Sequence, residues 1–208
     1  MCQYIETMMV DNDNIVNLYY HNRRLNATLH HISYLHEIVE IEKYVYPLIE
    51  KMKKESPGIK IFNYKARLLY DKDGVIDVTL SPYKIREVKT LKCVICDQIE
   101  YSYKSADRAK LNGLFAMRGD CDDIIIIKDG MVTDTSICNV AFWDGKRWFT
   151  PRYPLLKGTR REALLEGHVI IEENIPLCNI KRYSKICLFN AMIPFGVLEI
   201  GTDNICLP

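Results

Sequence analysis

The sequence predicts an α+β fold, with a small N-terminal part of helices and strands and a larger, strand-rich C-terminal part. Short apolar runs bounded by D-G and Asx turns indicate strands in both parts, while leucines at helical spacing indicate a few helices. At 208 residues the chain is long enough for one large or two small domains. The pattern changes after Asp97, so we expect domains at 1–97 and 98–208.

The first part is predicted to hold two hairpins, two helices and a final strand. One hairpin surrounds the turn-forming D-N-D-N cluster and the other surrounds D-K-D-G. A proline is tolerated in the first turn of a helix, and S-P-G ends one. In chain order, the predicted elements are a hairpin of Tyr4–Val10 with Ile15–Tyr20, a helix from His21 to about Leu35, a helix that opens at Pro47 and ends at Ser56, a hairpin of Ile59–Tyr70 with Val75–Leu80, and a strand at Arg86–Cys96.

The second part is predicted to be mostly strands. A run of four isoleucines indicates a buried strand, and K-D-G and D-G indicate hairpin turns after it. Glycines bound a short helix whose leucines Leu164 and Leu165 point inward. The predicted elements are a helix at Ser105–Arg118, strands at Asp123–Ile127, Met131–Thr133, Ala141–Trp143 and Arg147–Phe149, a helix at Gly158–Gly167, and strands at Ile186–Phe189 and Val197–Ile200.

Composition and charge exclude several classes of function. A formal net charge of +1 gives no field that would attract nucleic acid or an anionic membrane. No apolar run approaches the roughly 20 residues that span a bilayer, and no export signal is visible, so we expect a cytoplasmic protein with free thiols. Cys93 and Cys96 form a C-x-x-C, but no second ligand pair accompanies them, so no metal site is predicted.

Seven sequence blocks carry the chemical signal. They are I-E-T-M-M-V at 5–10, Y-H-N-R-R-L at 20–25, Y-K-S-A-D-R at 103–108, D-D-I-I-I-I-K-D-G-M-V-T-D-T-S-I-C-N at 122–139, W-F-T-P at 148–151, L-L-K-G-T-R-R at 155–161, and F-N-A-M-I-P at 189–194. In this order they resemble the class-IV aminotransferase family of pyridoxal-5′-phosphate (PLP) enzymes, of fold type IV, also known as the D-amino-acid aminotransferase-like fold. The last block looks most like the aminodeoxychorismate lyase branch. The resemblance covers nearly the whole chain.

The resemblance implies PLP as cofactor and assigns three principal positions. Lys104 matches the catalytic lysine that forms a Schiff base with the PLP aldehyde, and Lys110 breaks the spacing of the block. Arg24 matches the arginine that binds the cofactor phosphate. Asp134 stands where the family usually has a glutamate facing the pyridine nitrogen, although an aspartate here could also cap a turn.

Further residues match positions that line or brace the cofactor site. Thr159 begins a helix, where unpaired N–H groups favour an anion. Arg160 is assigned to the cofactor site, although it could be a surface charge, and Asn139 could be structural. The other matching positions are Ser136 and Asn190. His21 is interpreted as a structural residue at a helix start. Arg67 could bind a substrate carboxylate or be an ordinary edge-strand arginine.

Three hypotheses about function follow from the resemblance. The first is a lyase that converts 4-amino-4-deoxychorismate into 4-aminobenzoate and pyruvate, for folate synthesis. The second is an aminotransferase acting on a small or branched-chain amino acid. The third is a non-catalytic relative, because the sequence begins almost at Ile5, where the family usually has a preceding strand, and because Asp134 replaces a glutamate. The expected partners are a small amino substrate and a second copy of the chain in a homodimer.

Overall fold

The computed structural model describes residues 2–33 and 37–208, and within them the chain divides into two compact units. Unit 1 consists of the described residues up to Ile85 together with Tyr103–Asp107, and unit 2 consists of Arg86–Ser102 and Arg108–Pro208. Because each unit contains both helices and strands, the predicted α+β class is confirmed. The predicted domain boundary between residues 97 and 98 stays a prediction.

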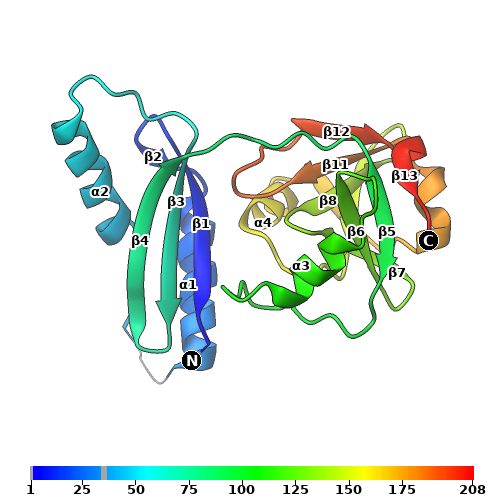
Figure 1. Ribbon diagram of the computed structural model, residues 1–208, viewed down its shortest axis with the longest axis horizontal. Helices are drawn as coiled ribbons and strands as arrows, with labels where there is room; N and C mark the ends of the chain where they lie inside the picture. The colour runs from blue at the N-terminus through cyan, green and yellow to red at the C-terminus, as the bar shows by residue number, and fades with distance from the viewer. Residues whose placement is uncertain (1, 34–36) are drawn as a thin grey trace. The chain divides into compact units, whose positions relative to one another are not determined.

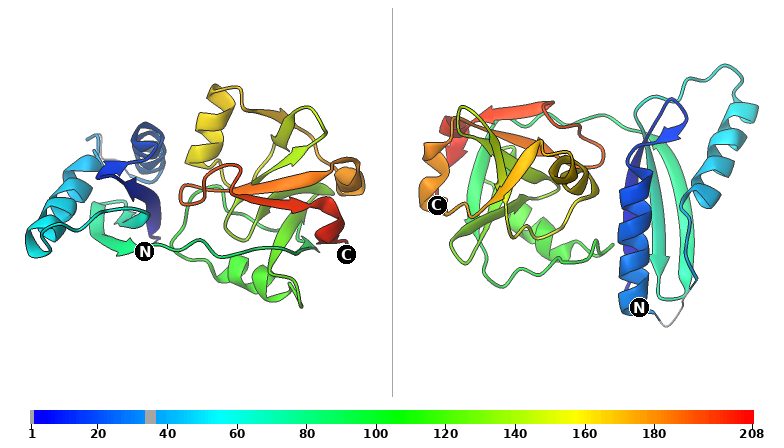
Figure 2. Two further views of the ribbon diagram at one scale, coloured as in Figure 1. Left: turned by 90° about the horizontal axis from the view of Figure 1, so that it is seen from above. Right: turned by 180° about the vertical axis from the view of Figure 1, so that it is seen from behind.

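Unit 1 is an antiparallel sheet covered on one face by two helices (Figures 1 and 2). Its strand order is β2-β1-β3-β4, and its helices are α1 and α2. The bounds are β1 Tyr4–Asp11, β2 Asn14–Ile15, α1 Leu18–Ile32, α2 Glu42–Glu55, β3 Tyr64–Asp71 and β4 Gly74–Pro82. Met8 and Leu68 of the sheet share one apolar core with Leu25 of α1 and Val45 of α2. Because side chains alternate along a strand, the even-numbered residues of β1 face the helices.

The edge of β1 that does not pair with β3 is covered by two different segments. β2 pairs with the end of β1, at Val10 and Asp11. At the beginning of β1, the Ile5 N–H donates to the Lys104 carbonyl (2.9 Å), and the Ala106 N–H donates to the Gln3 carbonyl (2.8 Å). Tyr103–Asp107 therefore belongs to unit 1 although its neighbours in sequence belong to unit 2.

Unit 2 contains a five-stranded sheet, β10-β9-β8-β11-β12, and a four-stranded sheet, β13-β5-β6-β7, in its described residues. Figure 1 shows α3 beside the four-stranded sheet and α4 beside the five-stranded one. The bounds are β5 Leu91–Ile95, α3 Ala109–Ala116, β6 Asp123–Lys128, β7 Met131–Thr135, β8 Asn139–Trp143, β9 Trp148–Pro151, α4 Thr159–Glu166, β10 Ile170–Glu173, β11 Lys185–Phe189, β12 Leu198–Gly201 and β13 Ile205–Cys206. All four isoleucines of β6 are buried, as the apolar run predicts.

Most predicted strands are confirmed within a residue or two, but the first hairpin is wrong in its second arm. β2 ends at Ile15, and Leu18–Ile32 is helical, so the aromatic run before His21 opens a helix instead of ending a strand. Asn17 adopts a left-handed conformation (φ 58°), which turns the chain from one element into the next. The predicted end of this helix, at Leu35, lies outside the described residues.

The predicted first residues of two other helices, α2 and α3, are also wrong, in both cases because of contacts with residues far away in sequence. Helix α2 begins before Pro47, because the side chain of Asn22 binds the Ile41 N–H (2.9 Å) and the carboxylate of Glu42 (2.8 Å). Helix α3 begins at Ala109 and not at Ser105, because the segment before it pairs with β1 as an extended chain. Strands β3 and β5 likewise begin five residues later than predicted, at Tyr64 and Leu91.

Candidate functional site

Helix α1 and strand β1 of unit 1 bring three ionisable side chains together. Glu6 faces α1 and accepts hydrogen bonds from His21 Nδ1 (2.6 Å), Arg24 Nε (2.7 Å) and Arg24 Nη2 (2.7 Å). The side chains of Glu6 and His21 are completely buried, and that of Arg24 is 15% exposed. His21 and Arg24 are one helical turn apart, so a single carboxylate reaches both.

The electrostatics of this cluster fix its protonation states. Burial by itself raises the pKa of Glu6, but the positive charge of Arg24 and the hydrogen bonds from His21 and Arg24 outweigh burial and lower the pKa to about 2. Burial lowers the pKa of His21 despite its bond to Glu6. At neutral pH the cluster is therefore a carboxylate, a guanidinium and a neutral imidazole, whose Nδ1–H donates to Glu6.

Sequence reasoning did not single out Glu6. A glutamate at an inward position of an apolar strand is a detectable signal, because a carboxylate is almost never buried without a partner. His21 fits its interpretation as a residue of the first helical turn. Its ring also holds Glu6 in place, however, and so contributes to the orientation of Arg24.

Lys104 lies next to this cluster in unit 1. Its carbonyl accepts the Ile5 N–H, so its backbone is fixed beside the residue that precedes Glu6. The Lys104 side chain is half-buried, and its positive charge is one of the causes that lower the pKa of His21. The structure thus brings the predicted lysine and the predicted phosphate-binding arginine into one neighbourhood.

Arg67 lies elsewhere on the same sheet. It is half-buried on β3 and pairs in register with Thr7 of β1. Odd-numbered positions on these strands point away from the face covered by the helices, since Ala66 and Leu68 pack under them. Arg67 therefore does not join the cluster of Glu6, His21 and Arg24, and its substrate-binding role stays a prediction.

In unit 2, Asp134 on β7 is a buried carboxylate. Its Oδ1 accepts a hydrogen bond from Asn139 Nδ2 (2.8 Å), and its Oδ2 accepts one from the Leu156 N–H (2.9 Å). Burial raises its pKa to about 6, although these hydrogen bonds and the more distant charge of Arg161 act in the opposite direction. The two donors, the Asn139 side chain and the Leu156 backbone, are both uncharged amides.

Asn139 and Gly158 connect Asp134 to the start of α4. Besides Asp134, Asn139 Nδ2 donates to the Leu156 carbonyl (2.8 Å). A Cβ atom placed on Gly158 would lie 2.0 Å from Asn139 Oδ1, so only glycine fits there. The buried Thr159 follows as the first residue of α4. The G-T-R turn is therefore held against the same asparagine that holds Asp134.

Arg160 and Asn190 brace a third loop of unit 2. Arg160 Nε donates to the Asn190 carbonyl (2.7 Å), and Arg160 Nη2 donates to the Ala191 carbonyl (3.0 Å). Asn190 Oδ1 in turn accepts the N–H groups of Met192 (2.8 Å) and Ile193 (2.9 Å). These contacts show Arg160 in a structural role, and its predicted contact with the cofactor is untested.

Ser136 is the remaining predicted residue, and it lies in the loop between Asp134 and Asn139. It is buried, and its carbonyl accepts a hydrogen bond from Arg108 Nη2 (2.7 Å). Asn190 Nδ2 donates to the carbonyl of the next residue, Ile137 (3.1 Å). The loops at 134–139, 156–160 and 190–193 are thus joined by side-chain hydrogen bonds.

The donors and charges present fit PLP. A buried carboxylate with neutral partners and a raised pKa is expected where a cation binds, and a protonated pyridine nitrogen is such a cation. The N–H groups at the start of α4 suit a phosphate, as does a guanidinium whose orientation is fixed by Glu6. Lys104 would supply the amine that PLP requires. No cluster able to hold a metal ion occurs among the described residues.

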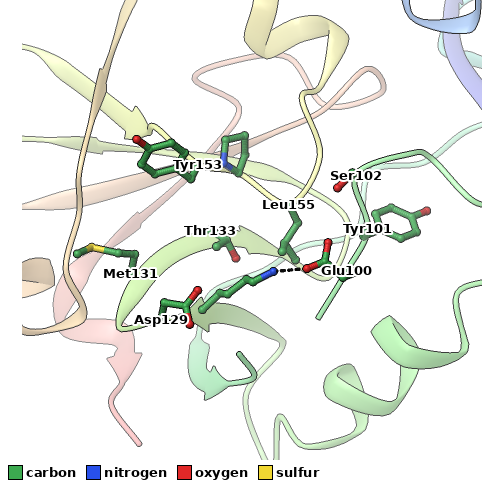
Figure 3. Close-up of a pocket in the computed structure, with 10 residues that line it drawn as sticks. Glu100, Tyr101, Ser102, Asp129, Met131, Thr133, Tyr153 and Leu155 are labelled. Carbon is green, nitrogen blue, oxygen red and sulfur yellow. Dashed lines mark hydrogen bonds and ion pairs between the residues drawn. The ribbon is translucent and has the colours of Figure 1, made fainter. Parts of the chain in front are cut away.

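Unit 2 also contains a cavity of about 240 Å³, shown in Figure 3. Its lining includes Thr133 and Leu155, which directly precede Asp134 and Leu156 in sequence, and the ion pair between Lys128 and Glu100. None of the residues assigned to the cofactor lines it. Because neighbouring residues of a strand point to opposite faces, we expect the cavity and the carboxylate of Asp134 to lie on opposite sides of β7.

No helix among the described residues is long and apolar enough to cross a membrane.

Comparisons with known proteins show the family and the fold of the chain. The family model described as amino-transferase class IV matches residues 3–200. An uncharacterised protein of Haemophilus influenzae is 37% identical over 192 residues, which are 92% of this chain and 98% of that protein. A protein of Schizosaccharomyces pombe provisionally named aminodeoxychorismate lyase is 36% identical over 92 residues, which are 41% of this chain and 40% of that one.

Among solved structures, one from Haemophilus somnus 129PT, provisionally named 4-amino-4-deoxychorismate lyase, is similar over 93% of this chain and 97% of its own. Its TM-score is 0.82 and its sequence identity is 32%. The branched-chain amino acid aminotransferase of Escherichia coli shares the fold at 13% identity, with a TM-score of 0.71. The chain therefore belongs to the class-IV aminotransferase family, a family of PLP-dependent enzymes.

Proposed function

We propose that the protein is a PLP-dependent lyase that converts 4-amino-4-deoxychorismate into 4-aminobenzoate and pyruvate. The observation that carries the proposal is the F-N-A-M-I-P block, which resembles the lyase branch and forms a closed turn around Asn190. The similarity to the Haemophilus somnus protein along nearly the whole chain supports it.

The residues of this chain suit each requirement of the reaction. When bound, PLP supplies an aldehyde that takes up the substrate amine and a ring that withdraws electrons from the neighbouring carbon. The Lys104 amine removes the proton from the substrate carbon that bears nitrogen. The Asp134 carboxylate would hold the proton on the ring nitrogen. Arg24 in unit 1 and the N–H groups at the start of α4 in unit 2 are each suited to bind a phosphate. The neighbouring bond between the substrate ring carbon and the enolpyruvyl oxygen then breaks as that ring becomes aromatic. The enolpyruvate that is released takes up a proton to become pyruvate.

The test is an assay of the purified protein with PLP and 4-amino-4-deoxychorismate, in which both products are quantified. We expect equal amounts of 4-aminobenzoate and pyruvate. Lys104→Ala should lower the rate at least a thousandfold, since it removes the group that moves the proton. Lys110→Ala is the matched control, because Lys110 is an exposed lysine of α3, and it should keep the full rate.

An aminotransferase is the alternative within the same family. It would need a keto acid for a second half-reaction and would convert the bound cofactor to its amine form. If the wild type forms no 4-aminobenzoate above the uncatalysed rate but shows this spectral conversion with an amino acid, the lyase proposal is wrong and the aminotransferase is supported.

A further inference from the structure

Two cysteines of unit 2 touch each other although they are 85 positions apart in sequence. Cys206 lies on β13, where it pairs in register with Lys92 of β5. Cys121 precedes β6, which pairs with the other edge of β5. Their Sγ atoms are 3.7 Å apart, so the side chains meet near the start of β5. Cys206 is exposed and Cys121 is half-buried, which leaves the pair within reach of small reagents.

We propose that Cys121 and Cys206 form a reversible disulfide when the protein meets a low-molecular-weight disulfide such as oxidised glutathione. The sulfur atoms of a disulfide are about 2.0 Å apart, so the two Sγ atoms need to approach by roughly 1.7 Å. Rotation of two side chains near the surface can supply a movement of this size. The site lies within unit 2 and requires neither the cofactor nor the proposed function.

The chemistry proceeds through two thiol–disulfide exchanges. The thiolate of one cysteine attacks oxidised glutathione, which forms a mixed disulfide and releases one glutathione thiolate. The second cysteine then attacks the protein sulfur of the mixed disulfide and releases the second glutathione. Two protein S–H bonds are lost and one S–S bond is formed. The two electrons and two protons end on the two molecules of reduced glutathione.

The surroundings determine which thiols react. Burial raises the pKa of Cys121, and the neighbouring Cys206 raises it further, so the reaction should accelerate as pH rises and the thiolate accumulates. Cys93 is also close to Cys206, but its pKa is raised to about 11, chiefly by burial, and its side chain is 1% exposed. Cys93 is therefore a poor competitor for the second exchange.

A disulfide at this site would fasten the C-terminal strand to the turn before β6. β13 is only two residues long and pairs with a single neighbour among the described strands, so few backbone hydrogen bonds hold it. A cross-link that closes a long loop restricts the unfolded chain, and this one should raise the thermal midpoint by about 5 °C or more.

The experiment treats the wild-type protein with oxidised glutathione at pH 8 and then blocks the remaining thiols. Intact mass and peptide mapping identify the products. We expect Cys121 and Cys206 to take up no blocking group and to appear in one cross-linked peptide that is two hydrogens lighter than the two free peptides together. The thermal midpoint should rise, and dithiothreitol should reverse both changes. Cys121→Ser and Cys206→Ser should each stop at a mixed disulfide with glutathione, and neither should gain thermal stability.

The matched control is the double variant C2S/C178S, which removes two other exposed cysteines. It should form the cross-link at the wild-type rate. The proposal is overturned if the wild type retains both hydrogens, if the cross-linked peptide contains another cysteine, or if the bond forms only between two molecules.

Discussion

Glu6 and Asp134 are two buried carboxylates whose pKa values shift in opposite directions, because their partners differ. Glu6 is hydrogen-bonded to a guanidinium, and its pKa is lowered to about 2. Ionised Glu6 therefore adds to the folding stability at any pH above the ordinary pKa of a glutamate, and this contribution is lost as the pH falls toward 2. Asp134 is bonded to neutral amides, so burial dominates and its pKa is about 6. Glu6 is paired with the cation Arg24 inside unit 1, whereas Asp134 is suited to bind a cation that belongs to a ligand.

Glu6→Gln tests whether this carboxylate orients Arg24 for the cofactor phosphate. The amide keeps the shape of the side chain but accepts fewer hydrogen bonds and carries no charge, so Arg24 loses a two-point contact. We expect PLP affinity, measured by absorbance titration, to fall about tenfold or more, while affinity for pyridoxal, which lacks the phosphate, is unchanged.

The control for this experiment is Glu50→Gln, which alters an exposed glutamate on α2 and should leave both affinities as in the wild type. An equal loss of affinity for PLP and pyridoxal in Glu6→Gln would contradict the orientation of Arg24 by Glu6.

At the scale of elements, most strands and the helix α4 follow from sequence patterns, whereas several starts do not. The buried isoleucines of β6 and the K-D-G turn after them are local signals, and the structure confirms both. The start of α2 depends on Asn22, which is about twenty residues away, and the extended segment at Lys104 depends on β1. A periodicity argument uses neighbouring residues and cannot include such contacts.

In the candidate site, too, the sequence does not reveal contacts between residues that are far apart along the chain. The family resemblance selects Lys104, Arg24, Asp134 and Thr159. In unit 1 the backbone of Lys104 binds Ile5, the residue before Glu6, and Glu6 binds Arg24. The resemblance does not select Glu6, whose importance depends on two side chains of a different element. It also assigns Arg160 to the cofactor, which stays a prediction, but it does not indicate that this side chain holds the backbone of the 190–191 turn.

Gly158→Ala tests the contact between the G-T-R turn and Asn139. The added Cβ would overlap Asn139 Oδ1, so the turn or the asparagine must move, and a shift of the asparagine would weaken its hydrogen bond to Asp134. We expect a loss of about 1–3 kcal/mol in the free energy of unfolding, measured with urea, and weaker PLP binding.

Gly113→Ala provides the matched control for this substitution. Gly113 lies inside α3, and a Cβ atom there would meet nothing within 4 Å. The alanine should be neutral or should stabilise the protein by about 0.5–1 kcal/mol. If both alanine variants behaved alike, the close approach of Gly158 to Asn139 would have no energetic consequence.

At the scale of the whole molecule, Asp134 makes stability depend on pH and on cofactor. Its pKa in the folded, cofactor-free chain is raised from 3.8 to about 6, so the folded state binds the extra proton. The contribution of this group to stability therefore falls as pH rises from about 4 to 6, by roughly 3 kcal/mol at most. A cation bound to the Asp134 carboxylate would stabilise its ionised form, so the folding stability would no longer fall over this pH range.

Asp134→Asn checks this linkage. Urea unfolding of the cofactor-free proteins should show that the variant gains stability relative to the wild type between pH 4.5 and pH 7, because it has no carboxylate to ionise. PLP should stabilise the wild type much more than the variant at pH 7. A stability difference that did not vary with pH would show that Asp134 keeps an ordinary pKa.

The homodimer implied by the family resemblance stays a prediction.

The interruption of unit 2 by Tyr103–Asp107 affects how the protein is made. During synthesis, the first strand leaves the ribosome about a hundred residues before the segment that covers its edge. Until that segment emerges, the nascent chain carries an open β-edge that other chains can pair with. A fragment that stops at residue 85 lacks Tyr103–Asp107 and keeps this edge of β1 open. We therefore expect such a fragment to aggregate.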